Sequence, residues 1–135
     1  GTSEITYELV MKYLKFKNMS TDEINEIKKL IKTFMDCDKN YLEKLLLVMT
    51  GRAKMPSGGY SNFIIEKSDY VRKVPFEVHT CFNQMIIPRE ILNKFIDSSD
   101  KTKTMLYAGF KPDFLISCLK YSNKGMAFSG FAAFM

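Results

Sequence analysis

Apolar residues recur at helical spacing through the first part of the chain. Ser20 or Thr21, with Glu23 at the position of a capping box, predicts the start of a helix. The apolar face of this helix is formed by Ile24, Ile27, Leu30, Ile31 and Phe34. A looser apolar stripe precedes it at Leu9, Tyr13, Leu14 and Phe16. A further helix is predicted over about residues 41–49, ending before Gly51. The first part of the chain is therefore predicted to be helical.

The periodicity changes after this helix. Three short runs, at residues 63–65, 75–78 and 82–87, are rich in β-branched and aromatic residues and are bounded by Gly, Asp and Pro. Pro88 ends the last run. These runs predict strands.

Helical spacing returns after Pro88. A short helix is predicted from Ile91, Leu92, Phe95 and Ile96. Asp113 is a candidate N-cap for a last helix. Residues 98–104 are polar and loop-like, and residues 105–110 fit helix or strand. This order predicts an α+β domain, in which N-terminal helices pack on a small β-sheet and a C-terminal helix and tail follow.

The composition agrees with one folded domain. Of 135 residues, 46% are apolar and 13% are aromatic, so a core is expected. The longest wholly apolar run, residues 45–49, is far shorter than the ~18 residues that a membrane-spanning helix needs. No signal sequence is recognised, so we expect no membrane partner. The expected domain covers residues 4–135, with residues 1–3 as a candidate cloning scar.

The net charge of +5 is spread along the chain. No run of five or more basic residues occurs, and the aromatic residues fall at core periods instead of alternating with basic ones. We therefore expect no nucleic-acid partner.

Cysteine and histidine are too few and too widely spaced for a structural zinc site. Cys37, Cys81 and Cys118 form no C-x-x-C pair, and His79 is the single imidazole. We expect no metal and no cofactor. An odd number of cysteines without a secretion signal is typical of a reducing compartment, which predicts the cytosol or the nucleus.

Cys81 is the candidate nucleophile because it lies between two strand-like runs, where a loop or strand end exposes it. Cys118 falls on the apolar face of a predicted helix and Cys37 lies near a helix end, so inert packing or placement at the surface is expected for them. On one extended strand the α-carbons of His79 and Cys81 would be roughly 6.6 Å apart, which argues against a protease dyad. His79 then either orders the loop by a hydrogen bond or lowers the pKa of the thiol. Transfer of an acyl group from one thioester to another suits such a cysteine, because a thiolate attacks and a thiolate leaves.

Several motifs follow one another in a fixed order. LLLVMTGRAKMPSGGY occupies residues 45–60, a strand-like FII follows at 63–65, and HTCFNQ at 79–84 is followed by Ile87-Pro88. In this order and spacing they resemble the C-terminal lobe of HECT-type ubiquitin ligases. The resemblance runs from about residue 45 to residue 88, and is looser over residues 5–35 and after Pro88.

The resemblance implies a covalent mechanism. Cys81 would accept ubiquitin from a charged conjugating enzyme, hold it as a thioester and deliver it to a substrate lysine. His79 and Thr80 would belong to the same catalytic loop. Asn83 would polarise the thioester carbonyl or, alternatively, act as a turn residue that bonds the backbone. Phe82 is expected to anchor the loop by packing, with a substrate contact as the alternative.

The sequence departs from the family pattern around and after Pro88. Residues 85–87 are all apolar where the family carries an acidic residue, and the segment before the last helix is long. For the aromatic residue that the family places near its carboxyl end we choose Phe128, with Phe131 and Phe134 as alternatives. An apolar tail that packs on a missing neighbour is an equally open interpretation.

The sequence therefore predicts the catalytic C-lobe of a ubiquitin-protein ligase, acting as a monomer. Its expected partners are ubiquitin, a protein substrate and a ubiquitin-conjugating enzyme that docks mainly on an N-terminal lobe. A chain of 135 residues has no room for that lobe. A noncatalytic ubiquitin-binding or adaptor module on the same fold, with a vestigial Cys81, is the alternative.

Overall fold

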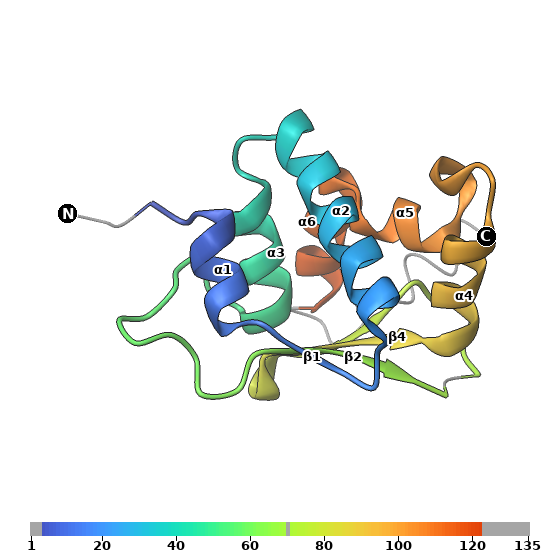
Figure 1. Ribbon diagram of the computed structural model, residues 1–135. Coiled ribbons are helices and arrows are strands. Elements are labelled where there is room, and N and C mark those ends of the chain that lie inside the picture. Colours follow the sequence, from blue (N-terminus) through green and yellow to red (C-terminus); the bar gives the residue numbers. More distant parts are fainter. Residues whose placement is uncertain (1–3, 70, 123–135) are drawn as a thin grey trace.

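The helices of the structure lie over one face of a small β-sheet (Figure 1). The computed structural model describes residues 4–69 and 71–122. In chain order the elements are α1 (Tyr7–Tyr13), β1 (Lys15–Lys17), α2 (Thr21–Cys37), α3 (Tyr41–Thr50), β2 (Ile64–Ser68), β3 (Glu77–His79), the 3₁₀ helix η1 (Thr80–Phe82), β4 (Gln84–Pro88), α4 (Arg89–Asp97), the 3₁₀ helix η2 (Lys101–Lys103), α5 (Met105–Phe110) and α6 (Pro112–Ser122). The predicted α+β class is confirmed.

The four strands lie in the order β1-β2-β4-β3. β2 pairs in parallel with both β1 and β4, and β3 is antiparallel to β4. Side chains alternate between the two faces of a sheet, so neighbouring rows of paired residues differ in character. The row that contributes to the core is Phe16, Ile65, Met85 and Val78. The next row, on the opposite face, is Lys17, Glu66, Ile86 and Glu77.

The core between the sheet and the helices is aliphatic and aromatic. Its fully buried side chains include Ile27, Ile31, Leu45, Leu46, Met49, Phe63, Phe76, Phe110 and Leu115. The Tyr41 hydroxyl is buried with them and donates a hydrogen bond of 2.6 Å to the carbonyl oxygen of Phe110. Burial raises the pKa of Tyr41 well above its usual value. This bond links the start of α3 to the end of α5.

The start of α2 is fixed by the predicted capping box. The Ser20 hydroxyl accepts from the backbone N–H of Glu23 at 3.2 Å, and the Glu23 carboxylate accepts from the backbone N–H of Ser20 at 2.8 Å. Glu23 is 8% exposed and also receives two hydrogen bonds from Nζ of Lys67, at 2.8 and 3.0 Å. Lys67 lies in β2, so this ion pair ties the first turn of α2 to the sheet.

The N-terminal segment is less helical than the sequence predicted. The stripe of four apolar residues does not form one helix, because α1 ends at Tyr13 and Phe16 lies in β1. Phe16 pairs in parallel with Ile65. So short an apolar pattern fits both the 3.6-residue period of a helix and the two-residue period of a strand. The pairing of Phe16 with a distant strand decides in favour of the strand.

The remaining predicted elements are present with small shifts. α3 ends at Gly51, which takes a φ of 80°. The ambiguous residues 105–110 form helix α5, capped by the Thr104 hydroxyl, which accepts from the N–H of Tyr107 at 3.2 Å. Asp113 lies in the first turn of α6, behind Pro112, and so does not form the predicted N-cap.

Candidate active site

Cys81 lies in a tight turn that joins β3 to β4. His79 pairs with Gln84, so residues 80–83, here called the Cys81 turn, reverse the chain between two antiparallel strands. The turn consists of η1 and of Asn83, whose backbone is left-handed, with φ 51° and ψ 46°. The N–H of Asn83 donates to the carbonyl of Thr80 at 3.3 Å and closes the turn. The thiol-bearing residue is exposed, as the sequence predicted.

Hydrogen bonds attach the Cys81 turn to the segment that enters β2. Nδ2 of Asn62 donates to the carbonyl oxygen of Phe82, and Nδ2 of Asn83 donates to the carbonyl oxygen of Asn62 at 2.9 Å. The N–H of Ile64 donates to the carbonyl oxygen of Asn83 at 3.1 Å. The amide of Asn83 therefore makes the backbone contact expected of a turn residue. Sequence reasoning missed Asn62, since nothing in its local pattern relates it to the turn.

The partner of the His79 side chain is Glu77. Its Nε2 lies 3.6 Å from Oε2 of Glu77, on the same face of β3. Glu77 also accepts from Nη1 of Arg72 at 3.3 Å. Within residues 4–69 and 71–122 no hydrogen bond joins His79 to Cys81.

Phe82 does not anchor the loop by packing, and that prediction is wrong. Its side chain is 63% exposed. The short 3₁₀ turn and the left-handed residue that follows it direct this side chain to solvent. Thr80, at the start of η1, is half-buried. Phe128, chosen above as the family's aromatic residue near the carboxyl end and hence as a candidate substrate-binding residue, lies outside the described residues.

The other two cysteines differ from each other. Cys118 is buried in α6, and burial raises the pKa of its thiol to about 12. Cys37 is the last residue of α2 and is exposed. Cys118 is thus packed in the core, and Cys37 lies at the surface at a helix end.

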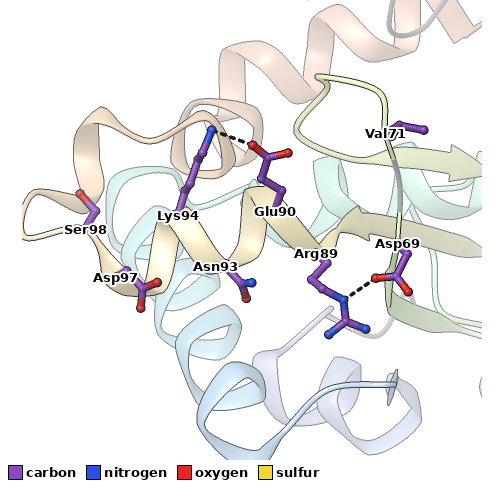
Figure 2. Close-up of a pocket in the computed structure, with 8 residues that line it drawn as sticks. All are labelled: Asp69, Val71, Arg89, Glu90, Asn93, Lys94, Asp97 and Ser98. Carbon is purple, nitrogen blue, oxygen red and sulfur yellow. Dashed lines mark hydrogen bonds and ion pairs between the residues drawn. The ribbon is translucent and has the colours of Figure 1, made fainter.

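A separate cavity of ≈ 620 Å³ lies where β4 continues into α4 (Figure 2). Charged side chains on its wall pair with each other: Arg89 with Asp69, and Lys94 with Glu90 at 3.0 Å. β2 and β4 are parallel, so the cavity lies at the carboxyl ends of these strands and the Cys81 turn at their amino ends. The cavity is therefore no part of the site around Cys81.

The described residues show no cluster of three or more His, Cys, Asp or Glu that would hold a metal ion. None of the helices in the described ranges is long and apolar enough to cross a membrane.

The fold and the site define an α+β domain that presents a thiol on a tight turn. A family model described as HECT-domain (ubiquitin-transferase) matches residues 1–105 of this chain. No curated protein gives a match. The chain belongs to the HECT-domain family of ubiquitin transferases, and its resemblance to the C-terminal lobe of a HECT-type ligase is confirmed.

Proposed function

We propose that this chain is the catalytic C-lobe of a ubiquitin ligase and that Cys81 carries ubiquitin as a thioester. The exposed position of Cys81 on a tight turn, in a chain of the HECT family, is the observation that supports this most. A donor as large as a protein requires such access from solvent. Cys118 offers none, because it is 1% exposed.

Two acyl transfers make up the proposed reaction. In the first, the Cys81 thiolate attacks the C-terminal carbonyl carbon of ubiquitin, a new sulfur–carbon bond forms, and the thiolate of the conjugating enzyme leaves. In the second, the neutral amine of a substrate lysine attacks the same carbon, an amide forms, Cys81 leaves as thiolate, and the amine proton passes to solvent. Since the first exchange is nearly balanced, the rate depends mainly on how the thiol is positioned.

The residues next to Cys81 take separate parts in this proposal. Phe82 offers an exposed apolar surface to the C-terminal tail of ubiquitin. Thr80 and Asn83 shape the turn through their mutual backbone hydrogen bond. His79, held beside Glu77, lines the approach along β3. The lobe acts as a monomer, and its partners are ubiquitin, a protein substrate and a conjugating enzyme that docks mainly on an N-terminal lobe.

Ubiquitin with a thiol-reactive group at its C-terminus tests this proposal without a conjugating enzyme. The wild-type chain is expected to form a covalent adduct, and Cys81→Ala is expected to form none. Cys37→Ala is the matched control, because Cys37 is the other exposed thiol of the described residues, and it should react like wild type. Binding of ubiquitin without an adduct would favour the adaptor function instead.

A further inference from the structure

Asn62 is attached to the Cys81 turn from outside it. Its side-chain amide donates to the carbonyl of Phe82, while the side-chain amide of Asn83 donates to the carbonyl of Asn62 at 2.9 Å. The two asparagines thus bond the same two segments in opposite directions. The bond from Asn83 is partly buried and the bond from Asn62 is exposed. Two reciprocal bonds of this kind fix the relative position of the two backbones more strictly than one bond does.

These bonds hold an unfavourable backbone conformation in place. Asn83 has a φ of 51°, and a residue with a β-carbon is less stable in this left-handed region than in the right-handed one. Asparagine tolerates the conformation better than most residues. The carbonyl before Asn83 is held by Asn62, and the carbonyl of Asn83 itself is held by the N–H of Ile64 at 3.1 Å. The peptide groups on both sides of Asn83 are therefore fixed by residues 62–64.

Side-chain packing does little to hold the outer part of the turn. Cys81 is exposed and Phe82 is 63% exposed, so neither buries enough apolar surface to anchor the backbone. The hydrogen bonds from Asn62 and from the N–H of Ile64 therefore contribute to that anchoring. Asn62 donates to the carbonyl of Phe82, which is the residue directly after Cys81.

We propose that Asn62 is a positioning residue for ubiquitin transfer: it keeps the Cys81 turn in the conformation that presents the thiol to the C-terminal carbonyl of ubiquitin. This inference rests on the proposed role of Cys81. Asn62 acts through the backbone of Phe82 and makes no contact with the reacting atoms.

The variant Asn62→Asp tests the inference, because it keeps the shape of the side chain but replaces the donor by a carboxylate oxygen that repels the Phe82 carbonyl. All proteins carry Cys37→Ala, so that Cys81 is the exposed thiol that reacts. Labelling by ubiquitin with a C-terminal vinyl methyl ester is followed over a range of probe concentrations. The maximal labelling rate of Asn62→Asp is expected to fall about tenfold, which corresponds to the loss of one well-placed hydrogen bond. The half-saturating probe concentration should stay within about twofold of the parent's.

Alkylation by iodoacetamide distinguishes a positioning role of Asn62 from a merely structural one. This small reagent approaches the thiol from any direction, so its rate with Cys81 in Asn62→Ala, which adds no negative charge near the thiol, should be no lower than in the parent. Asn93→Asp is the matched control, since Asn93 is an exposed asparagine of α4, at the other end of β4, and it should label at the parent rate.

Each other outcome counts against the inference. Asn62→Ala, which lacks the donor but adds no charge, is the second variant, and a parent-like maximal rate in both variants would overturn the positioning role. If both failed to fold, as judged by circular dichroism, Asn62 would be a structural residue and the proposal would fail. If ubiquitin did not label Cys81 of the parent although iodoacetamide did, the proposed function itself would fail, and the inference with it.

Discussion

The ion pair between Glu23 and Lys67 offers the sharpest test of how the helices are held on the sheet. Lys67→Met removes the ammonium group but keeps an unbranched side chain of similar length. The carboxylate of Glu23 would then stay next to the core, with only the Ser20 N–H to bond it. The side chains of Lys67 and Glu23 are 12% and 11% exposed, so water compensates little of the loss.

The size of the effect follows from this burial. Breaking a fully buried pair by removing one partner costs about 3–5 kcal/mol, and the remaining exposure places this pair near 2–3 kcal/mol. For a domain of this size that corresponds to a fall in the thermal midpoint of roughly 10 °C. Lys94→Met is the matched control, because the Lys94–Glu90 pair is 68% and 66% exposed and such surface pairs contribute about 0.2–1 kcal/mol.

The dependence on pH gives an independent check. Burial alone would raise the pKa of Glu23, but the hydrogen bonds from Lys67 and Ser20 outweigh it, so the pKa lies below its usual value. A carboxyl with a lowered pKa contributes stability above its unfolded pKa of about 4.3, and this contribution is lost as the pH falls through the folded value. Wild type should therefore lose stability on acidification below about pH 5, and Glu23→Gln should lose less.

Urea unfolding at pH 7 and at pH 4, followed by circular dichroism, measures both effects. A double-mutant cycle with Glu23→Gln and Lys67→Met should give a coupling of about 2 kcal/mol at pH 7 and a smaller one at pH 4. The reasoning would be refuted if Lys67→Met cost no more than Lys94→Met, or if the coupling did not change between the two pH values.

Three further predictions concern the core, the glycine-containing segment and the thiols. Tyr41→Phe should lower the free energy of unfolding by about 1–3 kcal/mol in urea, because it leaves a buried carbonyl without its hydrogen bond. Gly59→Ala should destabilise the chain more than Gly58→Ala in the same assay. Both glycines have positive φ, but a Cβ at Gly59 would overlap the ring of Tyr13, whereas nothing lies within 4 Å of a Cβ at Gly58. Alkylation of the native chain at pH 8, mapped by peptide mass spectrometry, should modify Cys81 and spare Cys118, which should react only after denaturation.

Local signals account for the parts of the fold that the sequence predicted. The start of α2 depends on Ser20 and Glu23, three positions apart, and the end of α3 depends on Gly51 alone. Both can be recognised within one turn of helix. β1 depends on a pairing with β2 far along the chain, and Phe16 alone does not reveal this pairing. The sequence therefore showed the local boundaries and missed the non-local strand.

The same distinction applies to the site. The position of Cys81 between two strands could be predicted, because the strand-like runs on either side are local patterns. The exposure of Phe82 could not be, since it depends on the left-handed conformation of Asn83. Asn62 also escaped prediction, because its bonding partners in the Cys81 turn are brought to it by the parallel pairing of β2 with β4.

Exchange with a small-molecule thioester of ubiquitin tests the central claim most directly, because it requires neither a conjugating enzyme nor an N-terminal lobe. After brief incubation, intact mass and peptide mapping locate the ubiquitin on the chain. The account predicts one ubiquitin per chain, attached to Cys81 and released by excess thiol reductant. Exchange at Cys81 no faster than at Cys37, or a reductant-resistant product that forms equally well in Cys81→Ala, would contradict it.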